Sequence, residues 1–146
     1  MAEATPDSET RRQILSAALK RFANAGYASS SVQQIVDAAK VSKPTLYYYF
    51  KDKSELFKAL VYEAHDERYR ILCEAAARHE DIRSQLEDVI TGLYDYFLGN
   101  RELMRISFAT MFAAPGEVPE NLCHTDKCER NFEFVHSLFK RAFGRA

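Results

Sequence analysis

Residues 43–53 carry a dense set of side chains that donate hydrogen bonds. The segment reads Lys-Pro-Thr-Leu-Tyr-Tyr-Tyr-Phe-Lys-Asp-Lys, and three tyrosines, Tyr47, Tyr48 and Tyr49, follow one another in it. Lysine ammonium and tyrosine hydroxyl groups donate hydrogen bonds to phosphate oxygens, and lysine and threonine side chains can also bind the edges of bases. The chemistry that this segment could perform is therefore recognition of a nucleic acid.

Core packing is the alternative role for the aromatic run Tyr47–Phe50, because aromatic side chains are commonly buried in globular proteins. Neighbouring residues of an α-helix lie about 100° apart around its axis, so four consecutive rings cannot all face one side. We therefore expect at least two of these rings to point outward, while Leu46 and Phe50 face the core.

Helix-start signals surround the tyrosine segment. Serine, threonine and aspartate satisfy free N–H groups at the beginning of a helix, and a proline is tolerated in the first turn, as Pro44 would be here. The predicted helices are 10–25, opened by a capping box from Thr10 to Gln13; 32–39, opened by a box from Ser31 to Gln34; 43–50, opened by Ser42; and 53–77, opened by Asp52.

Apolar spacing predicts three further helices in the second half of the chain. They cover 83–98, about 103–112 and 126–143, with a loop at 114–119. The apolar side of the first of them is expected to consist of Leu86, Val89, Ile90, Leu93, Tyr94 and Phe97. Since no stretch alternates in the manner of a strand, the predicted fold class is all-α.

The composition is that of an ordinary globular protein: 146 residues, 47% hydrophobic and 28% charged. The net charge of −1 excludes a uniformly basic coat. Residues 1–60 nevertheless hold nine Lys and Arg against six Asp and Glu, and residues 61–146 hold eleven against fifteen. A basic head on an acidic body favours a polyanionic partner at one end, although an offset of this size can also arise by chance.

Several other classes find no support in the sequence. No apolar run reaches the roughly 20 residues that span a bilayer, and the polar N-terminus is not a secretory signal. Three cysteines are an odd number and do not form a disulfide framework, which favours the cytoplasm. No catalytic triad, phosphate-binding loop or carboxylate pair is present, so neither an enzyme nor a cofactor is expected.

Two short helices joined by a tight turn, after a packing helix, predict a helix-turn-helix whose second helix fits the major groove of DNA. In sequence, residues 10–60 resemble the DNA-binding head of the tetracycline-repressor (TetR) family of bacterial transcription regulators. The matching stretches are Ile14-Leu15-x-x-Ala18-x-x-x-Phe22, Gly26-Tyr27, Ser30-Ser31-Val32-x-x-Ile35, and Val41 to Lys53 followed by Leu56.

This resemblance implies a role for each matching position. In the family, the positions of Ser31, Ser42, Tyr47, Tyr49 and Lys53 usually hold phosphates. Base edges or thymine methyls are met at the positions of Lys43, Pro44, Thr45 and Tyr48, and Gln33 on the preceding helix is a further candidate for a base contact.

Two positions depart from the family pattern. Lys40 stands where the turn between the two short helices generally has glycine, and a positive φ there would cost a lysine on the order of 1 kcal/mol. Tyr49 replaces the commoner histidine, which keeps a hydrogen-bond donor but removes a titratable group.

The resemblance also implies a ligand pocket in the later helices, whose occupancy changes the spacing of two heads in a homodimer. The residues expected to line it are Tyr94, Phe97, Phe108, Met111, Phe112 and Phe134, which favour an apolar or aromatic ligand. His65 and Tyr69 on the long helix, and His136 on the last, are candidate polar anchors. Ordinary core packing is the alternative for each of the six apolar and aromatic lining residues.

The expected domains are an N-terminal arm (1–9), a helix-turn-helix domain (10–55) and a helical effector-binding and dimerisation domain (56–146). Family members normally end with two further helices that pair in the dimer, and the sequence is expected to lack both. We expect a homodimer all the same, because half-sites about 34–36 Å apart need two heads.

A metal site at Cys123, His124 and Cys128 is a weaker hypothesis. These three ligands fall within six residues, but the spacing places no fourth partner. A loop that merely contains cysteine and histidine is the preferred interpretation, so no metal is expected.

The leading hypothesis is therefore a TetR-like repressor that binds a palindromic double-stranded DNA operator and is released by a small apolar or aromatic effector. Such a protein would be found in a bacterial cytoplasm, at the nucleoid. The alternative is a helical protein-interaction module whose exposed tyrosines bind another protein and not DNA, and a third hypothesis is a small helical metal-binding protein.

Overall fold

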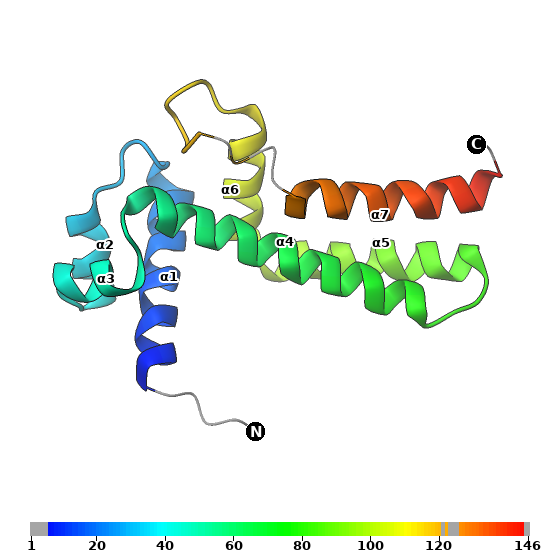
Figure 1. Cartoon of the computed structure of the whole chain (residues 1–146), viewed down its shortest axis with the longest axis horizontal. Helices are drawn as coiled ribbons and strands as arrows, with labels where there is room; N and C mark the ends of the chain where they lie inside the picture. The colour runs from blue at the N-terminus through cyan, green and yellow to red at the C-terminus, as the bar shows by residue number, and fades with distance from the viewer. Residues whose placement is uncertain (1–5, 121, 123–125, 145–146) are drawn as a thin grey trace.

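The computed structural model describes residues 6–120, 122 and 126–144, which form seven α-helices and no strand (Figure 1). The all-α prediction is confirmed. The helices are α1 (Pro6–Ala25), α2 (Val32–Ala39), α3 (Lys43–Tyr49), α4 (Lys53–Ala77), α5 (Ile82–Gly99), α6 (Arg101–Phe112) and α7 (Asp126–Phe143).

Helices α1, α2 and α3 gather around the beginning of α4 to form a head. Their apolar faces meet in one core, in which Ile14, Ile35, Leu46 and Leu56 are fully buried. The ring of Phe57 packs edge-on against Phe22, with centroids 5.1 Å apart. Each such burial contributes roughly 1.5–3 kcal/mol, so the head owes its shape to residues from all four helices.

The long helix α4 connects the head to the rest of the molecule. Its 25 residues span about 37 Å, and Figure 1 shows it running from the head to the far end, where it lies along α5 and α7. A second core fills this bundle, with Leu72, Val89 and Leu138 at its centre. Helix α6 packs on both α1 and α4, so it joins the body to the head.

Gly92 lies at a tight contact between α5 and α4. A Cβ atom at this position would lie 2.9 Å from Cγ2 of Ile71, a methyl group on a branched side chain that has little freedom to move. Glycine therefore allows the two helix backbones to come together there.

The first helix begins earlier than the sequence predicts. It starts at Pro6, so Thr10 lies inside α1 and does not cap it, and residues 6–9 are helical where an arm was expected. Proline is well suited to a first helical turn, and Asp7 and Glu9 place negative charge at the positive end of the helix. The expected end is correct: Gly26 follows Ala25 with φ +80°.

The predicted apolar side of α5 needs a correction. Val89 is buried, but Ile90 and Tyr94 are each 62% exposed. The buried polar residue Gln85 takes part in the contact instead and donates a hydrogen bond to the carbonyl of His79 at 2.6 Å. The apolar stripe of α5 is wider than the surface that α4 and α7 cover, and its remainder faces outward.

Candidate functional site

The capping residues that the sequence indicates begin both α2 and α3. The hydroxyl of Ser31 accepts the N–H of Gln34, and the side-chain oxygen of Gln34 accepts the N–H of Ser31. The hydroxyl of Ser42 accepts the N–H of Thr45. Lys40 between them has φ 56° and ψ 40°, the left-handed conformation, so its backbone is in the strained state that the sequence suggested.

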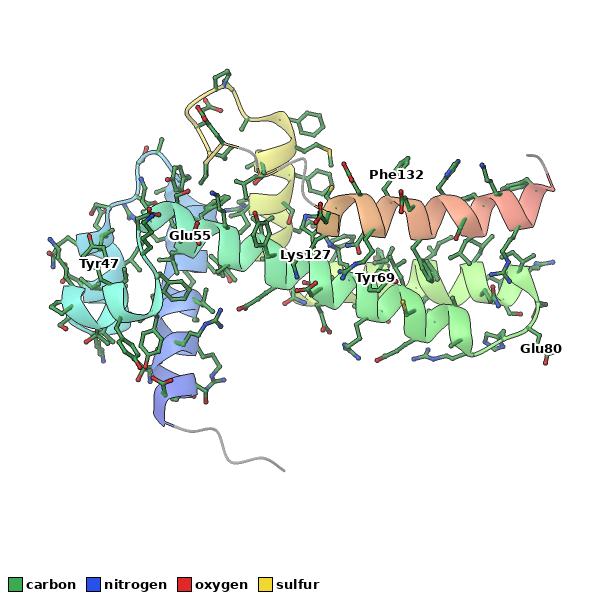
Figure 2. All side chains as sticks on the ribbon, in the orientation of Figure 1. Tyr47, Glu55, Tyr69, Glu80, Lys127 and Phe132 are labelled. Atoms are coloured by element: carbon green, nitrogen blue, oxygen red, sulfur yellow. The ribbon has the colours of Figure 1, made fainter. Side chains whose placement is uncertain are left out.

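Helix α3 presents one side to the core and the other to solvent. Leu46 is fully buried, and Phe50, which ends the helix, is 5% exposed. Tyr47 and Tyr48 are 49% and 76% exposed, which confirms that at least two of the four rings point outward. Figure 2 labels Tyr47 at the edge of the head, on the end farthest from α7.

The other residues predicted on this surface lie around the two tyrosines. Lys43 and Pro44 are exposed at the beginning of α3, and the half-buried Thr45 shares a hydrogen bond of 2.7 Å with the hydroxyl of Ser42. Gln33 is exposed on α2, and its side chain donates to Asp37 at 2.7 Å. Because α2 packs against α3, the turn brings these side chains to one end of the head.

Tyr49 and Lys53 differ from this exposed set, because each is bound within the protein. The Tyr49 hydroxyl donates to Oδ1 of Asp7, which together with partial burial raises the pKa of the tyrosine. The Lys53 ammonium donates to the carbonyls of Tyr27 and Ser30, at 2.9 Å each, and lies 4.2 Å from the centroid of the Tyr27 ring. Burial lowers the pKa of Lys53. This lysine ties the beginning of α4 to the segment before α2.

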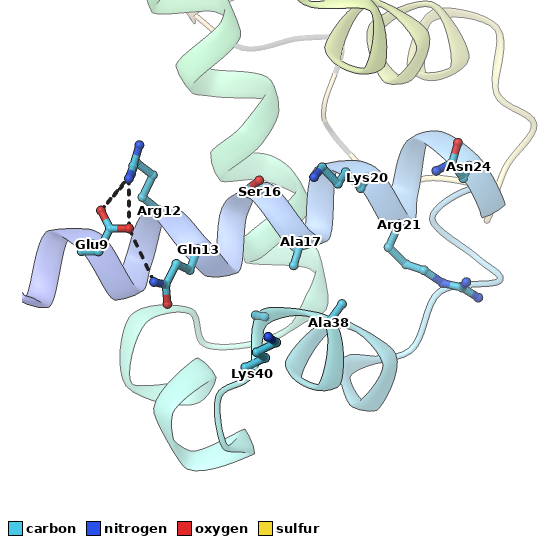
Figure 3. Close-up of a pocket in the computed structure, with 11 residues that line it drawn as sticks. Glu9, Arg12, Gln13, Ser16, Ala17, Lys20, Arg21, Asn24, Ala38 and Lys40 are labelled. Carbon is cyan, nitrogen blue, oxygen red and sulfur yellow. Dashed lines mark hydrogen bonds and ion pairs between the residues drawn. The ribbon is translucent and has the colours of Figure 1, made fainter.

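A basic groove on the side of the head was not predicted from the sequence. It lies between α1 and the end of α2 and has a volume of about 820 Å³ (Figure 3). Its cationic lining residues are Arg12, Lys20, Arg21 and Lys40, of which Arg12 is paired with Glu9 at 2.7 Å. Lys20 and Arg21 are neighbours in the sequence, but only the fold places them in the same groove as Lys40.

A second cavity, of about 390 Å³, lies in the body. Its lining consists of Val61, His65, Arg68, Phe97, Met104, Ser107, Phe108, Thr110, Met111, Leu122 and Cys128. The predicted residues His65, Phe97, Phe108 and Met111 are therefore brought together here. The size falls in the ordinary range for sites that hold small molecules.

The structure places the other predicted pocket residues elsewhere. Tyr94 and Phe112 are 62% and 79% exposed. Tyr69 and Phe134 pack edge-on against each other between α4 and α7, with centroids 5.7 Å apart. These two rings are used in the packing of the helix bundle, which was the alternative considered for Phe134. His136 also lies away from the cavity, stacked on Phe132.

Two further polar residues complete the cavity wall: Arg68, which the sequence did not single out, and Cys128, which the sequence suggested only as a metal ligand. One guanidinium nitrogen of Arg68 lies 2.9 Å from Nδ1 of His65. Since arginine can only donate, Nδ1 accepts and carries no proton. Burial, together with Arg68, lowers the pKa of His65 to about 4. The imidazole is thus neutral near neutral pH.

The other expectations concern metals and membranes. Cys123 and His124 lie outside the described residues; within the described part of the chain, no three His, Cys, Asp or Glu residues form a group that could hold a metal ion. Among the helices of that same part, none is long and apolar enough to cross a bilayer.

Comparison with known proteins finds relatives of this chain. Residues 14–60 match the sequence model described as bacterial regulatory proteins, tetR family. The chain is 29% identical over 113 residues to the HTH-type transcriptional activator FasR of Mycolicibacterium smegmatis, a match that covers 77% of this chain and 52% of the relative. The chain thus spans about half the length of that relative.

Two solved structures resemble most of the chain. A TetR family transcription regulator from Marinobacter aquaeolei is 25% identical with a TM-score of 0.72, over 93% of this chain and 68% of that one. A putative fatty acid metabolism regulator from Clostridium perfringens is 25% identical with a TM-score of 0.78, over 90% of this chain and 70% of that one.

Proposed function

The chain belongs to the TetR family of bacterial regulatory proteins, and on that premise we propose that it is a transcription regulator that binds DNA through its head and a small effector through its body. The head corresponds to residues 10–55, together with the beginning of α1, and the body to residues 56–146. The relatives are regulators by name, which favours a regulatory protein over an enzyme.

The single observation that carries the proposal is the outward face of α3. Tyr47 and Tyr48 are exposed, while Leu46 and Phe50 hold the helix to the core. A soluble protein gains nothing in stability from two exposed rings beside an exposed lysine, whereas a helix with this face can enter a major groove about 12 Å wide. The exposed rings therefore argue for a partner that covers them.

The roles of the individual residues follow from their position on this face. Hydroxyl groups of Ser31, Ser42 and Tyr47 would donate to phosphates, and that of Tyr49 would do so on release from Asp7; such contacts fix the register of the protein on DNA. The residues that would meet base edges or thymine methyls are Gln33, Lys43, Pro44, Thr45 and Tyr48. We assign Lys53 a positioning role, because its ammonium already holds two carbonyls of the head.

The basic groove would enlarge the positively charged surface of the head. Lys20, Arg21 and Lys40 lie next to the α2–α3 unit, where they raise the positive potential without reading sequence. Such a potential attracts the phosphate backbone and makes the affinity depend on salt.

A homodimer on a palindromic operator is the assembly that fits this head. Exposed apolar side chains remain on three helices of the body: Ile90, Tyr94 and Leu98 on α5, Phe108, Met111 and Phe112 on α6, and Phe132, Phe139 and Phe143 on α7. Surfaces of this kind mark protein–protein contacts. Repression would be relieved when an effector in the body cavity favours a head spacing that does not match the operator.

An electrophoretic mobility shift with DNA from upstream of the gene tests the proposal. We expect binding that weakens with salt, and a loss of about 1–3 kcal/mol of binding free energy for Lys43→Ala and for Tyr48→Ala. Lys140→Ala is the matched control, because Lys140 is an exposed lysine on α7. Unchanged binding by both head variants, or binding that ignores salt, would instead favour a protein-interaction module.

A further inference from the structure

Arg68 is the charged residue in an otherwise neutral cavity. The other lining residues are apolar, hydroxyl-bearing or thiol-bearing side chains, together with His65, whose imidazole is neutral near neutral pH. A guanidinium facing such a wall has lost part of its hydration. A loss of this kind is costly unless an anion or several acceptors replace the water.

No carboxylate compensates Arg68 within the described residues. The neighbouring acids on α4 are bound to other cations: Asp66 is paired with Lys127 and Arg130 of α7, and Glu67 is paired with Arg70. The partner found for Arg68 is the neutral ring of His65. The side of α4 that lines the cavity therefore carries a positive charge.

One donor of this guanidinium also lacks an acceptor. The Nε atom of Arg68 is buried and has no hydrogen-bond partner in the described structure. Burial lowers the pKa of Arg68, and Tyr96 and Cys128 offset the shift in part. A buried N–H without an acceptor destabilises a protein, so its presence beside a cavity suggests that the acceptor comes from a ligand.

From these observations we propose that the body cavity binds an apolar molecule bearing a carboxylate, and that Arg68 holds the carboxylate. Guanidinium groups recognise carboxylates through short, charge-assisted hydrogen bonds. The tail would lie among Val61, Phe97 and Met111, and the cavity of about 390 Å³ limits its size. The inference rests on the proposed function in that it treats this cavity as the effector site.

Binding of matched acids and esters to the full chain tests the proposal without DNA. Decanoate and naphthoate are each compared with their methyl esters by isothermal titration calorimetry, so that the two members of a pair share the apolar part and differ in the charge and one methyl group. We expect at least one acid to bind about tenfold or more tightly than its ester. Equal affinity within both pairs, or no binding of any of the four probes, would overturn the proposal.

Substitutions at two arginines test whether Arg68 causes the tighter binding of the acid. Arg68→Gln should bring the affinity for the acid down to that for the ester and leave the ester unchanged, whereas Arg68→Lys should keep part of the preference. The matched control is Arg70→Gln, because Arg70 lies two positions away on α4, is exposed, and is paired with Glu67 and Glu74. A preference that survives Arg68→Gln, or disappears in Arg70→Gln, would contradict the assignment.

This experiment separates the inference from the proposed function. Carboxylate binding through Arg68 with no shift of upstream DNA would support the cavity assignment and count against the regulator. A DNA shift by a chain that binds none of the four probes would leave the regulator intact and remove the carboxylate ligand.

Discussion

The hydroxyl of Tyr49 donates a hydrogen bond of 2.5 Å to Oδ1 of Asp7, which lies 42 residues earlier in the chain. The contact joins the beginning of α1 to the end of α3. It also places an exposed carboxylate beside the surface that we propose for DNA, and occupies a hydroxyl that would otherwise donate to a phosphate. We therefore expect Asp7 to oppose the proposed DNA binding through both its charge and its hydrogen bond.

Replacing Asp7 should strengthen DNA binding. For Asp7→Asn we expect the dissociation constant to fall several-fold at low salt, with the gain shrinking as salt rises, because the change removes a like charge near the phosphates. Fluorescence anisotropy with labelled upstream DNA measures this. Asp126→Asn, a change in the first turn of α7, is the control. Weaker or unchanged binding of Asp7→Asn would show that the Tyr49 contact supports the DNA-binding form instead.

Lys53 distinguishes a positioning residue from a phosphate contact. Lys53→Met removes both hydrogen bonds to the carbonyls of Tyr27 and Ser30, and should lower the free energy of unfolding by about 1–3 kcal/mol. Chemical denaturation measures the loss. For DNA binding at a temperature where the variant is folded, we expect the salt dependence to stay as in the wild type. A stable Lys53→Met variant whose salt slope falls by about 0.9 would identify a phosphate contact instead.

The capping residues of the head could be predicted because their signals are local. Ser31, Ser42 and Asp52 each cap the helix that follows them, since the bonds involved span only three residues. Thr10 shows the limit of the same argument. It begins a sequence that also fits a capping box, but the helix already starts at Pro6, and nothing in the local pattern distinguishes a cap from a threonine inside a helix.

The body was harder to predict because burial there depends on which helix covers which face. Ile90 and Tyr94 continue the apolar stripe of α5 and are nevertheless exposed, whereas Gln85 is buried. Arg68 could not be singled out either, because charged residues on a long helix usually face solvent. Only the arrangement of α4, α5, α6 and α7 around one cavity gives this arginine its place.

The left-handed backbone at Lys40 predicts a stabilising substitution. Lys40→Gly should raise the free energy of unfolding by up to about 1 kcal/mol, because glycine adopts φ 56° without the strain of a Cβ atom. For a chain of this length that corresponds to roughly 2–4 °C in the melting temperature. Lys40→Ala removes the same charge but keeps a Cβ atom, so it should show no such gain. Equal melting temperatures for the two variants would rule out backbone strain as the cause.

His65 predicts a loss of stability in mild acid. Its pKa is lowered from 6.5 to about 4 by burial and by Arg68, with Lys127 and Arg130 of α7 adding to the effect and Asp66 opposing it. Between these two values the unfolded chain takes up a proton that the folded chain does not, so the stability held above about pH 6.5 falls as the pH drops toward about 4.

Denaturation curves at several pH values measure this contribution. His65→Gln cannot take up a proton, so the difference in stability between wild type and variant should shrink or reverse as the pH falls from about 7 to about 5. An NMR titration of the His65 ring, assigned through the variant, should give a midpoint near 4. A midpoint near 6.5 would mean that the ring is solvated and that Arg68 lies too far away to influence it.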